Sequence, residues 1–192
     1  MRPGPLSMKW EYFLDARDYQ TAAAAWKVGL LSPEDSTWVA ASALQRGVDT
    51  QTIREVAGLL SPTRRDDGEK IERMFAELGV GVPETALALQ WLVPSLLFRI
   101  LEGDANEFDG VMGVIWKLRL DDSDEPNRSV GTAWQRLVQT MYEWDDLYDV
   151  LGPCGYAASP EKLDRKRLAL VAKTRSWANQ ELTRVDGARG GP

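Results

Sequence analysis

Three aspartates in the last third of the chain, Asp145, Asp146 and Asp149, have a spacing that could support chemistry. They lie in the stretch DDLYD, at positions i, i+1 and i+4. Carboxylate oxygens are ligands that Mg²⁺ prefers, and a magnesium ion held by them can bind the phosphate groups of a substrate. One interpretation is therefore a magnesium-dependent enzyme that acts on a phosphorylated substrate through these three residues.

The same stretch resembles the Asp-Asp-x-x-Asp motif of helical prenyl and terpene synthases. That resemblance implies a second metal-binding helix, but TRSWANQEL (residues 174–182) lacks the required spacing, and such enzymes are longer than 192 residues. At ~100° per residue, the apolar stripe of this helix is centred near Met141 and Tyr148, and the aspartates fan away from it. Carboxylates that face solvent do not line a cavity, so the enzyme is the alternative and not the preferred interpretation.

The composition removes most other catalytic chemistry. The chain has no histidine and a single cysteine, Cys154. Triads with histidine, histidine-ligated metals, zinc fingers and iron–sulfur clusters are thereby excluded. We expect no catalytic residue and no cofactor. A lone cysteine also forms no disulfide within the chain, which favours a reducing, cytoplasmic location.

Charge is unevenly distributed along the chain. The formal net charge is −6, residues 101–150 contain twelve acids and four bases, and residues 151–192 contain four acids and eight bases. The acidic middle repels nucleic acid and suits a protein partner with a basic surface. The basic stretch DRKRLALVAK (164–173) is expected to pair with acids of the same chain. A homodimer, in which it pairs with a second copy, is left open.

The preferred functional site is an acidic face with an aromatic residue in it. Aromatic side chains supply contact area at interfaces, while carboxylates steer and pair with arginine. Trp144 and Tyr148 are expected in the core instead. This pattern predicts a non-enzymatic interaction protein, such as an immunity-like or antitoxin-like inhibitor or an adaptor. The predicted partner-binding residues are Tyr142, Glu143, Asp145, Asp146, Asp149, Asp121 and Asp122, with Asp124 and Glu125 beside them.

A third interpretation is a helix-turn-helix DNA-binding regulator in residues 50–78. Arg64 and Arg65 begin its second helix, where side chains could read bases. Several acids follow at once, however, and would repel phosphates.

Capping residues divide the chain into about eight helices, which predicts an all-α fold in a single domain. The pentapeptide GLLSP occurs twice, at 29–33 and 58–62. Each copy is expected to end one helix at its glycine and to start the next at its Ser-Pro. The expected helices cover residues 19–28, 33–46, 50–58, 68–78, 83–102, 107–118, 129–151 and 160–182.

The helix at 83–102 has little polar surface and is expected to be the central buried helix, kinked or split at Pro94. It is interrupted by polar residues, so a membrane span is not expected. Gly110 and Gly113 are expected to allow close helix packing. The expected organisation is an N-terminal extension (1–16), a helical domain (17–183) and a disordered tail (184–192). Tryptophans expected in the core are Trp26, Trp38, Trp91, Trp116, Trp134 and Trp177.

Four short stretches also resemble a family of uncharacterised all-helical actinobacterial proteins. They are IREVAGL, the Val-Pro at 82–83, ILEGDANEFDGVMGVIW (100–116) and YEWDD (142–146). The resemblance spans residues 20–180 and implies one all-α domain. It implies no activity, ligand or catalytic residue.

Overall fold

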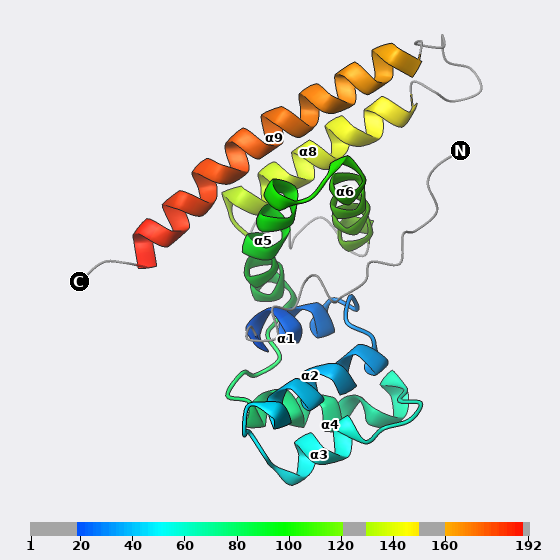
Figure 1. The fold of residues 1–192 in the computed structure, drawn as a ribbon, viewed down its shortest axis with the longest axis vertical. Coiled ribbons are helices and arrows are strands. Elements are labelled where there is room, and N and C mark those ends of the chain that lie inside the picture. Colours follow the sequence, from blue (N-terminus) through cyan, green and yellow to red (C-terminus); the bar gives the residue numbers. More distant parts are fainter. Residues whose placement is uncertain (1–18, 121–129, 150–159, 190–192) are drawn as a thin grey trace. The chain divides into compact units, whose positions relative to one another are not determined.

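The computed structural model describes residues 19–120, 130–149 and 160–189, apart from a few side chains at helix ends. In these residues every regular element is an α-helix, so the predicted all-α class is confirmed. The eight described helices are shown in Figure 1. They are α1 (Tyr19–Lys27), α2 (Pro33–Gln45), α3 (Gln51–Ala57), α4 (Arg64–Glu77), α5 (Thr85–Glu102), α6 (Ala105–Leu120), α8 (Thr132–Asp149) and α9 (Pro160–Arg189).

The described helices form two compact units, which divide within α5 between Leu92 and Val93. The N-terminal unit contains α1 to α4 and the first part of α5. The C-terminal unit contains the rest of α5 with α6, α8 and α9. The predicted N-terminal extension lies outside the described residues. The predicted disordered tail is wrong for residues 184–189, because α9 continues to Arg189.

In the N-terminal unit, α2, α3 and α4 pack against one another and α1 packs on α4. Six consecutive residues of α1, Thr21 to Trp26, are buried, so this short helix is enclosed on every side. Its four alanines permit that, since a small side chain lets neighbouring elements approach the helix backbone from all directions. Other buried side chains of the unit include Leu31, Val39, Ile53, Ile71, Met74 and Phe75.

The first copy of GLLSP behaves as the sequence predicts. Gly29 has φ +71°, a left-handed conformation that glycine adopts without steric cost. Ser32 then caps α2 through a capping box with Asp35, and Pro33 occupies the first turn. Leu30 and Leu31 are both buried. The pentapeptide thus ends α1 and begins α2.

The second copy of GLLSP ends α3 at Gly58, as predicted, but the prediction that its Ser-Pro starts the next helix is wrong. Gly58 has φ −90°, and Leu60 is 98% exposed. The cap of α4 is Thr63, whose side-chain oxygen accepts a hydrogen bond from the backbone N–H of Asp66 at 3.1 Å. Because Thr63 lies beyond the Ser-Pro pair and supplies its own cap, α4 begins at Arg64 and not near residue 68.

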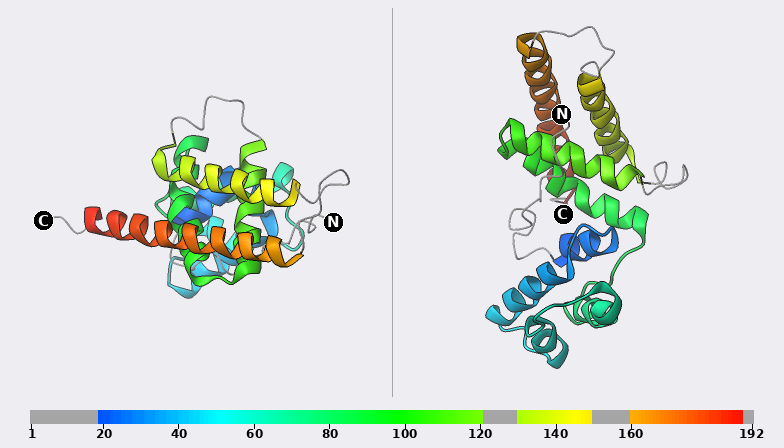
Figure 2. Two further views of the ribbon diagram at one scale, coloured as in Figure 1. Left: turned by 90° about the horizontal axis from the view of Figure 1, so that it is seen from above. Right: turned by 90° about the vertical axis from the view of Figure 1, so that its right-hand side faces the viewer.

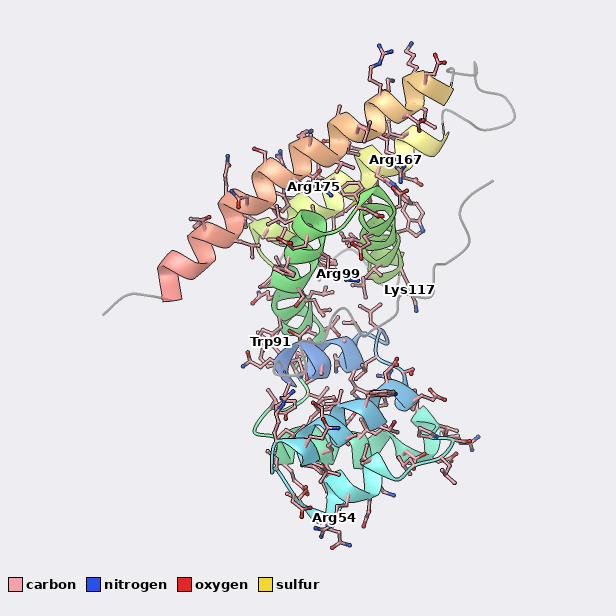
Figure 3. All side chains as sticks on the ribbon, viewed as in Figure 1. Arg54, Trp91, Arg99, Lys117, Arg167 and Arg175 are labelled. Atoms are coloured by element: carbon pink, nitrogen blue, oxygen red, sulfur yellow. The ribbon has the colours of Figure 1, made fainter. Side chains whose placement is uncertain are left out.

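In the C-terminal unit, α8 and α9 run side by side in opposite directions, and α6 packs against both (Figure 2). Arg175 of α9 joins α5 to this arrangement. Its Nε lies 2.9 Å from the carbonyl oxygen of Ile100, and its Nη2 donates to the carbonyl oxygen of Gly103. Ile100 lies in the last turn of α5 and Gly103 just beyond it, where carbonyl groups have no partner within the helix, so the guanidinium satisfies them (Figure 3).

Helix α5 is continuous through Pro94, so the proline does not split it. Much of it is buried as predicted, including Leu92, Leu96 and Ile100. Leu87 and Phe98 are exceptions, at 42% and 57% exposed. Among the described residues α5 is the one helix whose length and composition would allow it to cross a membrane, a weak signal that core helices of soluble proteins also give.

The two glycines of α6 do not make the close approach predicted for them. A Cβ atom placed on Gly110 or Gly113 would meet no atom within 4 Å. The tight position is Gly103, just before α6, where a Cβ would lie 2.6 Å from the carbonyl oxygen of Arg99. Close packing is therefore found at the start of α6 and not in its middle.

Candidate functional site

The predicted acidic face lies on the second half of α8. Tyr142, Asp145, Asp146 and Asp149 are spaced i, i+3, i+4 and i+7, which places them on one side of a helix. Tyr142 is 39% exposed, Asp146 is exposed and Asp145 is half-buried. Asp149 is the last residue of α8, and its side chain lies outside the described part of the chain. We call Tyr142, Asp145 and Asp146 the acidic face.

Glu143 was predicted to belong to this face, but the structure places it elsewhere. Its Oε2 lies 2.7 Å from Nζ of Lys173 in α9. The reason is geometric: Glu143 lies about 100° around the helix from Tyr142, on the side that α9 covers. Glu143 is therefore engaged within the chain, as expected for the basic stretch at 164–173.

Trp144 points inward and binds Asp109 of α6. Its Nε1 donates to Oδ1 of Asp109 at 2.9 Å. The same carboxylate pairs with Arg167, whose side chain is 23% exposed against 11% for Asp109. These contacts connect α6, α8 and α9 and hold the acidic face in place. Sequence reasoning missed Asp109 and Arg167, because nothing in the spacing of residues so far apart signals a contact.

The remaining predicted partner-binding residues cannot be placed on this face. Asp121 and Asp122, with Asp124 and Glu125, lie outside the described residues.

The charge at the end of α8 opposes the helix dipole. Its last turn contains Asp146 and Asp149 and no basic residue. The C-terminus of a helix carries partial negative charge, so a carboxylate there costs about 0.3–1 kcal/mol. These acids therefore do not stabilise the helix that carries them.

The magnesium alternative requires three convergent carboxylates. Among the described side chains, which do not include that of Asp149, no group of three potential metal ligands lies together. Asp145 and Asp146 are consecutive, so their side chains leave the helix about 100° apart. The alternative stays a prediction, without support from the two aspartates that are described.

The helix-turn-helix alternative loses one of its two arginines to an internal contact. The guanidinium carbon of Arg64 lies 4.1 Å from the ring centroid of Trp26, and Nη2 donates to the Trp26 carbonyl. The Trp26 Nε1 donates in turn to Glu72 at 3.3 Å. The connection between the two helices, residues 58–63, is also longer than the usual helix-turn-helix turn of about 3–4 residues. Arg64 thus fastens α4 to α1, although its side chain is exposed like that of Arg65.

The tryptophans expected in the core differ in their surroundings. Trp26 and Trp134 are fully buried, as predicted. Trp38 is 74% exposed, so its prediction as a core residue is wrong. The buried side of α2 is formed by the small residues Ser36, Ala40 and Ala43 with Val39, which turns Trp38 toward solvent. The half-buried tryptophans are Trp91, Trp116 and Trp177.

No protein-family model, no curated protein and no solved structure matches this chain. Its resemblance to a helical actinobacterial family therefore stays a prediction, and its function must be argued from its own residues.

Proposed function

We propose that this chain is a non-enzymatic interaction protein of the cytoplasm, whose acidic face binds a protein partner with a basic surface. An immunity-like or antitoxin-like inhibitor, or an adaptor, would act in this way. The supporting observation is the exposed pair Tyr142 and Asp146 at the end of α8, where negative charge is unfavourable for the helix itself. Residues that cost stability are commonly retained for binding or catalysis.

The chemistry of the acidic face suits a basic partner. Tyr142 supplies a flat, amphipathic ring that can be covered without much loss of conformational freedom. Asp146 is exposed and can accept paired hydrogen bonds from an arginine. Glu143, which lies beside this face, pairs with Lys173 within the chain. The positive charge that pairs with the exposed Asp146 would come from the partner.

Site-specific photo-cross-linking tests the proposal. The chain would carry p-benzoylphenylalanine in place of Tyr142 and be irradiated in an extract of its native host. We expect a covalent product with a basic protein, identified by mass spectrometry. The matched position is Gln135, exposed on the same helix about 10 Å away, which should give no such product.

Two charge reversals make the test specific. Asp146→Lys should abolish the product, whereas Glu161→Lys, an equal change on an exposed residue of α9, should not. A product that survives Asp146→Lys would contradict the proposal. So would micromolar Mg²⁺ binding in calorimetry that disappears in Asp145→Ala, because it would favour the enzyme.

A further inference from the structure

Trp38 forms an exposed aromatic position in the N-terminal unit. It is 74% exposed and lies in the middle of α2, with Val39 and Ala40 buried on the opposite side. The next residues on its own side, Ala41 and Ser42 at i+3 and i+4, are small. The indole therefore stands above the surface of the helix, and its face is open to a partner.

A carboxylate lies beside this indole. Glu34 is exposed and precedes Trp38 by four residues, so the two side chains are neighbours on α2. The other acid of this turn, Asp35, is engaged: its Oδ2 accepts the hydroxyl of Ser32 at 2.8 Å in the capping box. Glu34 is thus the carboxylate available to a ligand that lies over Trp38.

The same unit shows that an arginine guanidinium can lie over an indole ring. Arg64 lies over the ring of Trp26 while Glu72 accepts a hydrogen bond from that indole, so aromatic face, carboxylate and guanidinium come together. Arg46 lies 5.4 Å from the ring centroid of Tyr19. Among the described residues no cation lies over Trp38 in this way. Trp38 and Glu34 offer an open aromatic face and a neighbouring carboxylate, whose charge is complementary to a guanidinium.

We propose that Trp38 and Glu34 bind an arginine side chain of a protein partner. The guanidinium stacks on the indole through a cation–π interaction and pairs with the carboxylate of Glu34. Arginine suits this position better than lysine, because its planar group can stack and pair at the same time. The site belongs to a different unit from the acidic face and does not depend on it.

The experiment follows the indole N–H resonances of the intact, ¹⁵N-labelled chain. The Trp38 resonance is assigned by its loss in Trp38→Phe. The probes are a short arginine-rich peptide and a lysine-rich peptide of the same length and charge. We expect a saturable shift of the Trp38 resonance, with tighter binding of the arginine peptide.

Two glutamate variants separate a local pair from overall charge. Glu34→Gln should weaken the apparent affinity about threefold, the loss typical of one exposed ion pair. Glu69→Gln, on the exposed surface of α4, should leave it unchanged. An unmoved Trp38 resonance, equal affinity for the two peptides, or equal losses in the two variants would overturn the proposal. A Trp38 shift on changing protein concentration without peptide would also overturn it, in favour of a second copy as the occupant.

The Asp146→Lys variant keeps this proposal apart from that for the acidic face. It should leave the Trp38 titration unchanged while it abolishes the cross-link at position 142. The Trp38 titration and the cross-link at position 142 can fail independently, so each measurement tests one site.

Discussion

Arg167 of α9 donates two hydrogen bonds to the carboxylate of Asp109 in α6, fifty-eight residues earlier in the chain. Trp144 of α8 donates a third to the same group. One carboxylate thus fastens three helices, and it is mostly buried, with 11% of its side chain exposed. A charge in such a place depends on its partners, because water reaches it poorly.

Loss of Arg167 should therefore cost more than loss of an exposed cation. We expect Arg167→Ala to lower the free energy of unfolding by about 2 kcal/mol, since it removes the cation that pairs with the mostly buried carboxylate of Asp109. Lys173→Ala removes an ion pair at the surface and should cost less than about 1 kcal/mol. Urea unfolding of both variants measures the difference. Equal losses would contradict the role assigned to Asp109.

Two glycines near α6 should respond to alanine in opposite directions. Gly113 is exposed within the helix and has open space around it, so Gly113→Ala should stabilise the protein by about 0.5–1 kcal/mol. Gly103→Ala should destabilise it, because the new methyl group would collide with the backbone oxygen of Arg99. Thermal unfolding distinguishes the two. A neutral Gly103→Ala would mean that this junction yields easily.

Asp146 should cost the folded protein stability. Removing its charge in Asp146→Asn should raise the free energy of unfolding by about 0.3–1 kcal/mol, because the carboxylate lies in the last turn of α8. The opposite case is Glu161 in the first turn of α9, where Glu161→Gln should lower stability by a similar amount. Both effects should shrink in high salt. If Asp146→Asn were destabilising, the dipole argument for the acidic face would fail.

Glu77 should make stability depend on pH. Hydrogen bonds from Thr50 and from Thr52, the latter at 2.7 Å, lower the pKa of its carboxyl group, with a smaller contribution from Arg73. A folded-state pKa below the unfolded one contributes stability above the unfolded pKa, and this is lost as pH falls through the folded pKa. Thr52→Val should raise the pKa of Glu77 in a carboxyl NMR titration.

The stability difference between the natural chain and Thr52→Val should shrink on acidification through that range. A difference that does not change with pH would show that the Thr52 hydroxyl acts on packing and not on the Glu77 carboxylate.

The sequence best predicts the features that depend on residues close together in the chain, such as helix starts. Ser32 and Pro33 carry the complete start signal of α2, and the structure uses it. Thr63 is an equally good N-cap residue, but the Ser-Pro just before it led to a wrong prediction of where the next helix starts. Local signals therefore located the helices, while the start of α4 depended on which of two competing caps is used.

The parts that could not be predicted depend on contacts between distant residues. Helical spacing placed Asp146 outward, as found, but it could not show that Lys173 would take up Glu143. Nor could helical spacing predict that Trp38 is exposed. The four consecutive residues from Trp38 to Ala41 are all apolar, so they do not indicate which face of α2 is buried. Which side of such a helix is buried depends on the neighbours that fold against it.

The two copies of Gly-Leu-Leu-Ser-Pro have a consequence for antibody recognition. Leu31 is 1% exposed in the first copy, and Leu60 is 98% exposed in the second. Pro62 of the second copy is buried, so an antibody whose contacts centre on the leucines would reach the second copy more readily than the first in the native protein, and both copies in the denatured chain. The stoichiometry of its binding would then report the unfolding of the α1–α2 junction directly.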